Sequence, residues 1–259
     1  MEWNGLRGWA FDLDGVIWAG EEPMPGALEL IAALREAGRQ VVFLSNNSGW
    51  TAAGLAEKLT QMGIAATAEN VVSPVGAAGD FLLQQYGRVR VLVSGLPALA
   101  DSLQAVGHTP VSDPNLAEAV VMGRDFDFNY ERLALVCRAV DRGIPFIALN
   151  KDVRLPIEGG GWAPGLGAMV AAVVAATGRE PQLVGKPSPL LFEAAMARMG
   201  TRPSESVMVG DTPAADIAGG LRAGMWTVLV GNSQAEPAAH MRVADPADLL
   251  GRWRSEEKI

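Results

Sequence analysis

The stretch Trp9-Ala10-Phe11-Asp12-Leu13-Asp14-Gly15 decides the fold, because an apolar run ends abruptly on two acids. The apolar residues predict a buried strand, and Gly15 predicts a turn directly after it. Two carboxylates this close repel each other unless one is protonated or a cation lies between them. Mg²⁺ prefers such oxygen ligands. Taken alone, the Asp-x-Asp-Gly segment is equally compatible with an Asx turn at the end of a strand.

Short apolar runs alternate with amphipathic stretches along the rest of the chain. Residues 41–44 predict a strand covered on both faces, and residues 25–38 predict a helix that starts at a proline and ends at a glycine. Strands alternating with helices are typical of an α/β fold with a doubly wound parallel sheet. In such folds, functional groups gather at the carboxyl ends of the strands.

Composition excludes several classes of protein. The 259 residues allow one large domain or two modest ones, and 49% hydrophobic with 19% charged residues excludes a disordered chain. A net charge of −8 argues against nucleic acid as a partner. We expect no membrane span and no signal peptide, and therefore a cytoplasmic protein. One cysteine and two histidines leave carboxylates, hydroxyls and lysine as the chemical groups.

Two further polar segments follow predicted strands. Ser45-Asn46-Asn47 offers a hydroxyl and amides at the entrance to a helix, which suits a phosphate or another oxyanion, although these residues also form ordinary turns. Lys186 lies between a glycine and a proline, in a turn that would aim its ammonium group. A single lysine in a turn is usually solvated, so its significance depends on its neighbours.

Asp211 and Asp216 form a second acidic pair, again after an apolar run. Asp211 by itself could simply cap the helix that follows. Adjacent strands of one sheet could instead bring this pair beside Asp12 and Asp14. Together these groups would suit phosphoryl transfer: a carboxylate nucleophile, a second carboxyl as acid and base, and Mg²⁺ with a lysine to neutralise charge.

Four segments then resemble the motifs of the haloacid dehalogenase superfamily, and within it the NagD-like phosphatases, which include 4-nitrophenylphosphatases. They are residues 11–16 (FDLDGV), 44–48 (LSNNS), 184–189 (VGKPSP) and 209–216 (VGDTPAAD). All four occur in the family order across nearly the whole chain. The resemblance implies a Rossmann-like core with an inserted α/β cap domain.

The resemblance also implies a role for each motif residue. Asp12 would be the nucleophile, Asp14 the general acid and base, Ser45 a ligand of the phosphoryl oxygens, and Lys186 a partner of nucleophile and phosphate. The cofactor would be Mg²⁺, held by the residues Asp12, Asp14 (through its backbone carbonyl) and Asp211, with Asp216 assisting.

The long interval between Ser45 and Lys186 exceeds what a single crossover needs, so a domain must be inserted there. We expect residues 1–85 and 181–259 to form the catalytic core and residues 86–180 to form the cap. In the family, a cap loop reads the substrate, and here it would be the stretch from Asn150 to Gly161. The substrate-binding candidates are Asn46, Asn47, Asn150, Asp152 and Arg154.

The favoured function is a Mg²⁺-dependent phosphatase for a small phosphorylated metabolite, whose identity stays open. A phosphomutase or phosphotransferase on the same core is an alternative. Asp14 argues against a dehalogenase, since those relatives lack the second aspartate. A phospho-acceptor signalling module would be about half as long and lack the insert. The resemblance further implies a homodimer through the cap as a possible assembly.

Overall fold

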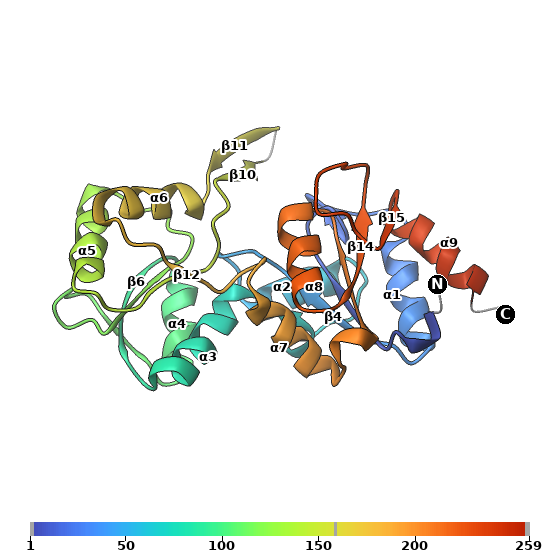
Figure 1. The fold of residues 1–259 in the computed structure, drawn as a ribbon, viewed down its shortest axis with the longest axis horizontal. Coiled ribbons are helices and arrows are strands. Elements are labelled where there is room, and N and C mark those ends of the chain that lie inside the picture. Colours follow the sequence, from blue (N-terminus) through green and yellow to red (C-terminus); the bar gives the residue numbers. More distant parts are fainter. Residues whose placement is uncertain (1–2, 158–159, 257–259) are drawn as a thin grey trace. The chain divides into compact units, whose positions relative to one another are not determined.

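The computed structural model describes residues 3–157 and 160–256, which form two compact units. The first, here called the core unit, comprises Met1–Ser45, Ala52–Val72 and Lys186–Ile259. The second, the inserted unit, comprises Asn46–Thr51 and Ser73–Gly185. In Figure 1 the core unit is blue and orange to red, and the inserted unit is mainly green to yellow.

The core unit is built on a parallel six-stranded sheet with the order β15-β14-β13-β1-β4-β5. Phe11 at the end of β1 pairs with Val209 of β13 on one side and Phe43 of β4 on the other. The residues that follow these three central strands therefore leave the sheet at the same edge. The strands are β1 (Gly8–Phe11), β4 (Gln40–Leu44), β5 (Val71–Val72), β13 (Ser206–Gly210), β14 (Trp226–Val230) and β15 (Met241–Val243).

Helices cover both faces of this sheet. Alternate residues of each strand point to opposite sides, so the apolar strands present buried side chains on both faces. Trp9 and Phe11 belong to an apolar cluster with buried residues of α1, α2 and α9, and Trp9 stacks on Trp3 with ring centroids 5.4 Å apart. Ala10, between Trp9 and Phe11 in the sequence, points to the opposite face of the sheet. Helix α7 packs against β1 and β4. The core helices are α1 (Ala27–Glu36), α2 (Ala52–Gln61), α7 (Pro189–Met199), α8 (Ala218–Arg222) and α9 (Pro246–Glu256).

Several short elements complete the core unit. β2 (Trp18–Ala19) and β3 (Glu22–Pro23) form a small antiparallel hairpin directly after β1. A π-helical segment, Pro213–Ile217, follows β13 and carries Asp216 into the interior. The 3₁₀ segments are Trp3–Gly5, Ala68–Asn70 and Pro203–Glu205.

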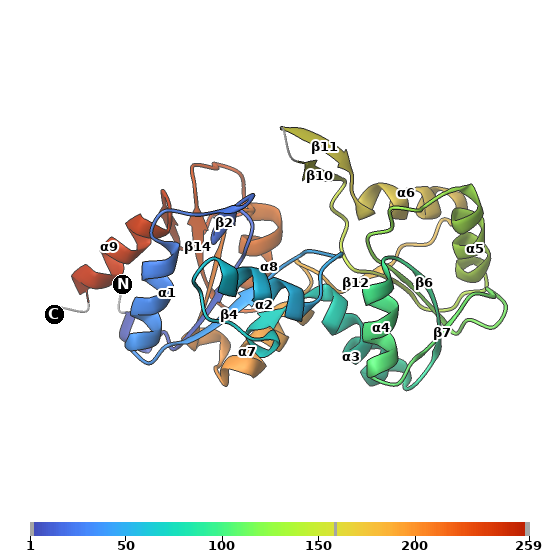
Figure 2. The same ribbon diagram turned by 180° about the vertical axis from the view of Figure 1, so that it is seen from behind.

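The inserted unit has its own parallel sheet, with the order β12-β9-β8-β6-β7. Its strands β12, β6 and β7 are labelled in Figure 2. Its strands are β6 (Arg90–Ser94), β7 (Thr109–Val111), β8 (Ala119–Met122), β9 (Phe146–Ala148) and β12 (Gln182–Leu183). Its helices are α3 (Pro74–Tyr86), α4 (Pro97–Ala105), α5 (Tyr130–Asp141) and α6 (Leu166–Thr177). An antiparallel hairpin, β10 (Arg154–Ile157) and β11 (Gly161–Pro164), projects between β9 and α6 along the chain.

The units divide at positions that differ from the expected 86–180 boundaries. The inserted unit already begins at Ser73, because α3 packs against α4, and it ends at Gly185. It also includes the segment Asn46–Thr51, which follows β4. Within the described residues, no helix has both the length and the apolar character that a bilayer span requires.

Two glycines at the ends of α1 provide a matched test of the packing between α1 and α9. Gly26 has φ +76°, and a Cβ there would lie 2.5 Å from the Cα of Ala247 in α9. Gly38 has φ +72°, and a Cβ there would have no neighbour within 4 Å among the described residues.

We expect Gly38→Ala to lower the free energy of unfolding by about 1 kcal/mol through backbone strain alone. Gly26→Ala should lower it by roughly 2–4 kcal/mol, since overpacking against a backbone adds to that strain. Urea unfolding curves of both variants measure the difference, and equal losses would contradict the packing argument.

Candidate active site

Three of the motif residues directly follow the central strands. Asp12 follows β1, Ser45 follows β4 and Asp211 follows β13. The backbone N–H of Asp12 donates to the carbonyl of Val209 at 2.8 Å, and that of Ser45 donates to the carbonyl of Val72 at 3.0 Å. The sheet ladder therefore holds the backbones of Asp12 and Ser45, and the parallel register brings these strand ends together.

Lys186 connects two of the acids. Its Nζ donates to Asp12 Oδ1 at 2.7 Å, to Asp216 Oδ1 at 2.6 Å and to the carbonyl of Leu44 at 3.1 Å. The Lys186 side chain is only 2% exposed, and that of Asp216 is fully buried. A buried ammonium group stays charged only when carboxylates compensate its charge. The lysine and the two acids therefore form one hydrogen-bonded ion cluster.

Burial and mutual repulsion dominate the electrostatics of the site. Burial raises the pKa of Asp12, to about 8, and the nearby charge of Asp216 adds to that rise, while Lys186 opposes it. Burial alone would lower the pKa of Lys186, but Asp12 and Asp216 outweigh this effect and raise it. Burial is also the main reason why the pKa of Asp211 is raised. These carboxylates are therefore crowded together and short of compensating charge.

The acids fit a divalent cation. Asp12, Asp211 and Asp216 each offer a carboxylate oxygen, and these oxygens lie within 4.8 Å of one another. Lys186 compensates only part of the charge of three acids, and hard cations such as Mg²⁺ prefer carboxylate oxygens. Gly15 and Gly210 allow the crowding, because a Cβ at Gly15 would collide with Asp211 and one at Gly210 with Asp216. The side chains present are thus suited to a metal site.

Asp14 has a different environment from the other acids. Its side chain is exposed, is not part of the three-acid cluster, and accepts a hydrogen bond from Trp18 Nε1 at Oδ1, 2.8 Å away. Its backbone carbonyl as a metal ligand stays a prediction. Trp18 was not identified from sequence. The only available signal was a tryptophan, which has a single polar N–H, four residues after Asp14.

Three substrate-binding candidates of the inserted unit bind one another. Asn150 Nδ2 donates to the backbone carbonyl of Asn46 at 2.7 Å, and Asn46 Nδ2 donates to Asp152 Oδ2 at 3.3 Å. The backbone N–H of Asp152 donates to Asn150 Oδ1 at 3.2 Å. Asn47 Oδ1 accepts from the backbone N–H of Gly49 at 2.9 Å, as in a turn. These contacts join the base of the β10–β11 hairpin to the segment that follows Ser45.

Arg154, the remaining candidate, lies at the start of the hairpin. Its guanidinium carbon is 4.3 Å from the centroid of the Trp162 ring, and both side chains are exposed. Cation–π stacking of this kind holds a guanidinium group in place while its N–H donors stay accessible. Residues 158 and 159 of the expected substrate-reading loop lie outside the described residues.

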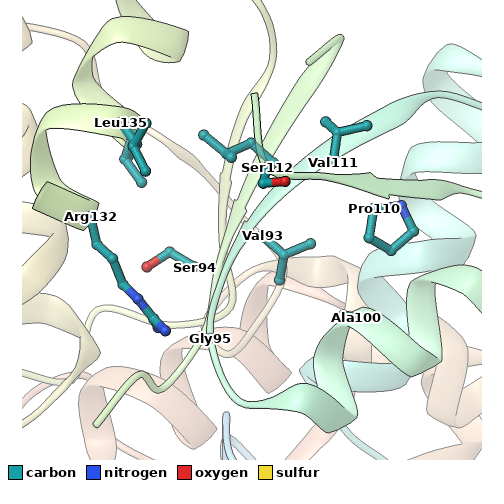
Figure 3. A pocket seen from close by; sticks show the side chains of 11 residues that line it. Val93, Ser94, Gly95, Ala100, Pro110, Val111, Ser112, Arg132 and Leu135 are labelled. Atoms are coloured by element: carbon teal, nitrogen blue, oxygen red, sulfur yellow. The ribbon is translucent and has the colours of Figure 1, made fainter. Parts of the chain in front are cut away.

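A separate cavity of about 420 Å³ lies within the inserted unit (Figure 3). Arg132 and Leu135 of α5 line it together with Ser94 at the end of β6. Nη1 of Arg132 donates to both oxygens of the buried Asp125, at 2.5 and 2.6 Å. The cavity therefore holds no uncompensated cation among its described lining residues, and it is a poor site for a phosphate group.

Comparison with known proteins identifies the family. Residues 9–109 match the family model described as haloacid dehalogenase-like hydrolase, and residues 183–251 match a second model described as HAD-hydrolase-like. The chain belongs to the haloacid dehalogenase-like hydrolases. The resemblance predicted from the four motifs is thereby confirmed, and so is the α/β fold with a doubly wound parallel sheet.

Relatives within these hydrolases cover most of the chain. The 5'-nucleotidase YutF of Bacillus subtilis is 36% identical over 224 residues, which are 86% of this chain and 86% of that protein. Human glycerol-3-phosphate phosphatase is 35% identical over 248 residues, 85% of this chain and 77% of its own. The crystal structure of 4-nitrophenylphosphatase from Thermotoga maritima has a TM-score of 0.90 at 30% identity and covers 97% of this chain and 98% of that one. NagD from E. coli K-12 has a TM-score of 0.86 at 29% identity, covering 94% and 98%.

The three-acid cluster predicts that loss of one of its acids weakens the binding of Mg²⁺. Asp211→Asn removes one charged ligand, so we expect the affinity for Mg²⁺ to fall by about tenfold or more. Calorimetric titration with Mg²⁺ measures this change. Asp101→Asn, at an exposed position of α4, removes the same charge elsewhere and should leave the affinity unchanged. Equal affinities in both variants would argue against the cluster as the metal site.

Proposed function

We propose that this chain is a Mg²⁺-dependent phosphatase that hydrolyses a small phosphate monoester through an aspartyl-phosphate on Asp12. The observation that carries the proposal is the buried Lys186 ammonium, 2.7 Å from Asp12 and beside a cluster of three acids. A carboxylate held in this way is oriented for attack. Lys186, together with a cation held by the acids, would compensate the charge of a phosphoryl group. The names of the relatives, which include phosphatases and a 5'-nucleotidase, support the same reaction class.

Asp12, Asp211 and the backbone carbonyl of Asp14 would hold Mg²⁺, with Asp216 in support. When bound, the ion supplies charge neutralisation to the phosphoryl oxygens. Lys186 supplies a second positive charge and fixes the Asp12 carboxylate through its hydrogen bond. The hydroxyl of Ser45, which is buried at the end of β4, is assigned to a phosphoryl oxygen. These groups are largely organised before substrate binds, which lowers the cost of reorganisation.

The reaction has two displacements. In the first, a carboxylate oxygen of Asp12 forms a bond to phosphorus, the bond from phosphorus to the ester oxygen breaks, and Asp14 gives its proton to that oxygen. In the second, the Asp14 carboxylate takes a proton from water as the water oxygen attacks phosphorus, and the bond from phosphorus to Asp12 breaks. Inorganic phosphate leaves, and both aspartates return to their starting states.

The inserted unit is assigned the role of a cap that selects the substrate. Its β10–β11 hairpin presents Arg154 on Trp162, and the contacts among Asn46, Asn150 and Asp152 anchor the base of that hairpin. A cap favours small phosphorylated metabolites over phosphoproteins, because bulky substrates are excluded. Arg154 would bind a second anionic group when the substrate has one.

Loss of the nucleophile tests the proposed reaction. With 4-nitrophenyl phosphate and Mg²⁺, we expect sustained release of phosphate and a fall in kcat of about 10⁴-fold or more for Asp12→Asn, because the amide is a poor nucleophile. Asp101→Asn serves as the control for loss of one negative charge. Full turnover by Asp12→Asn would rule out the aspartyl-phosphate mechanism.

Removal of the hairpin arginine tests the substrate assignment. Arg154→Gln should lower kcat/KM for phosphoglycolate, which has a carboxylate, about tenfold relative to glycerol 3-phosphate, which has no second anionic group. Arg138→Gln on α5 removes an arginine from another part of the same unit and should leave this ratio unchanged. An unchanged ratio for Arg154→Gln would show that the arginine does not read the substrate.

A further inference from the structure

Trp18 in the hairpin after β1 holds the side chain of Asp14. Its indole Nε1 donates to Asp14 Oδ1 at 2.8 Å. A backbone hydrogen bond also links the two segments, since the N–H of Gly15 donates to the carbonyl of Trp18 at 2.7 Å. Trp18 is only 2% exposed, whereas Asp14 is exposed. A rigid buried ring thus orients a carboxylate that would otherwise sample several rotamers.

Lys58 of α2 contacts the face of the Trp18 indole ring. Its Nζ lies 4.8 Å from the centroid of the Trp18 ring, and it donates to the carbonyl of Gly20 and to Glu21 Oε1, both at 3.0 Å. The Lys58 side chain is 17% exposed. One ammonium group therefore connects the ring, the turn between β2 and β3, and helix α2. The hairpin is held to the body of the core unit.

We propose that Trp18 is a positioning residue that orients the Asp14 carboxyl group for proton transfer, and that Lys58 holds Trp18 in place. The indole N–H is a donor only, so Oδ1 of Asp14 must act as an acceptor. The hydrogen bond therefore fixes the orientation of the whole carboxyl group through Oδ1. This inference rests on the proposed function, in which Asp14 acts as general acid and base.

The consequence for the reaction depends on the leaving group. In the proposed first displacement, Asp14 gives its proton to the ester oxygen while the bond from phosphorus to that oxygen breaks. An alkoxide is a strong base and leaves slowly without this proton, whereas 4-nitrophenolate is a weak base and leaves readily. A misplaced Asp14 should therefore slow the cleavage of alkyl esters much more than that of aryl esters. General damage to the fold would slow both equally.

The test compares kcat/KM for glycerol 3-phosphate with kcat/KM for 4-nitrophenyl phosphate. Trp18→Phe keeps an aromatic ring and removes the N–H donor, and we expect the alkyl-to-aryl ratio to fall about 10- to 100-fold. The control is Trp253→Phe, the same substitution at another fully buried position of the core unit, which should leave the ratio unchanged. A wild-type ratio in Trp18→Phe would overturn the proposal.

A measurement without turnover tests the hydrogen bond itself. In protein labelled with ¹⁵N-tryptophan, the indole signal absent from Trp18→Phe identifies Trp18. We expect Asp14→Asn to shift that signal, because the amide oxygen is a weaker acceptor than a carboxylate. A signal that does not move would overturn the proposal even if the kinetics changed.

Two further variants test the role of Asp14 and the role of Lys58 separately from that of Trp18. Asp14→Asn should lose alkyl phosphatase activity; if it kept that activity, the role of Asp14 in the proposed function would be wrong, independently of Trp18. Lys58→Met leaves the aromatic ring in place and provides the kinetic test if Trp18→Phe does not fold. It should lower the alkyl-to-aryl ratio in the same direction by a smaller factor, and an unchanged ratio would overturn the role of Lys58.

Discussion

The site depends on one buried ammonium group. Lys186 is almost completely shielded from water, and it donates hydrogen bonds to Asp12 after β1, to Leu44 at the end of β4 and to Asp216 in the π-helical segment after β13. Removing it would leave Asp12 and Asp216 buried without compensation, at a cost of several kcal/mol. The lysine therefore offsets part of the repulsion that opposes the close approach of these acids. The same lysine thus compensates the charge of the acids and links the ends of β1 and β4.

Much of this arrangement could be predicted from the sequence. Asp12, Ser45 and Asp211 each follow an apolar run, and parallel strands bring their carboxyl ends to one edge of a sheet. The order of the four motifs and the long interval before Lys186 also indicated the family and an inserted unit. These features depend on patterns that are local in the sequence, namely strand ends, spacing and residue type, so they do not require knowledge of side-chain packing.

Other features could not be predicted because they depend on tertiary contacts. The inserted unit starts at Ser73 because α3 packs on α4, and no local signal between residues 73 and 86 marks that choice. Asn46 is a substrate-binding candidate from its motif, but the sequence does not reveal that its backbone carbonyl and its side chain both bind residues at the base of the hairpin. Trp18 resembles an ordinary core residue in the sequence, since only its orientation reveals the hydrogen bond to Asp14.

The insertion also affects how the site assembles during folding. Asp12 and Lys186 are 174 positions apart, so the chain must close a very long loop to form their ion pair, and closure entropy grows with loop length. In the inserted unit, however, Asn46 lies against Gly185, and both are hydrogen-bonded to residues 149–150. Once this unit is folded, its two ends are adjacent, and the effective loop between Ser45 and Lys186 is short. Early folding of the inserted unit would therefore speed assembly of the core.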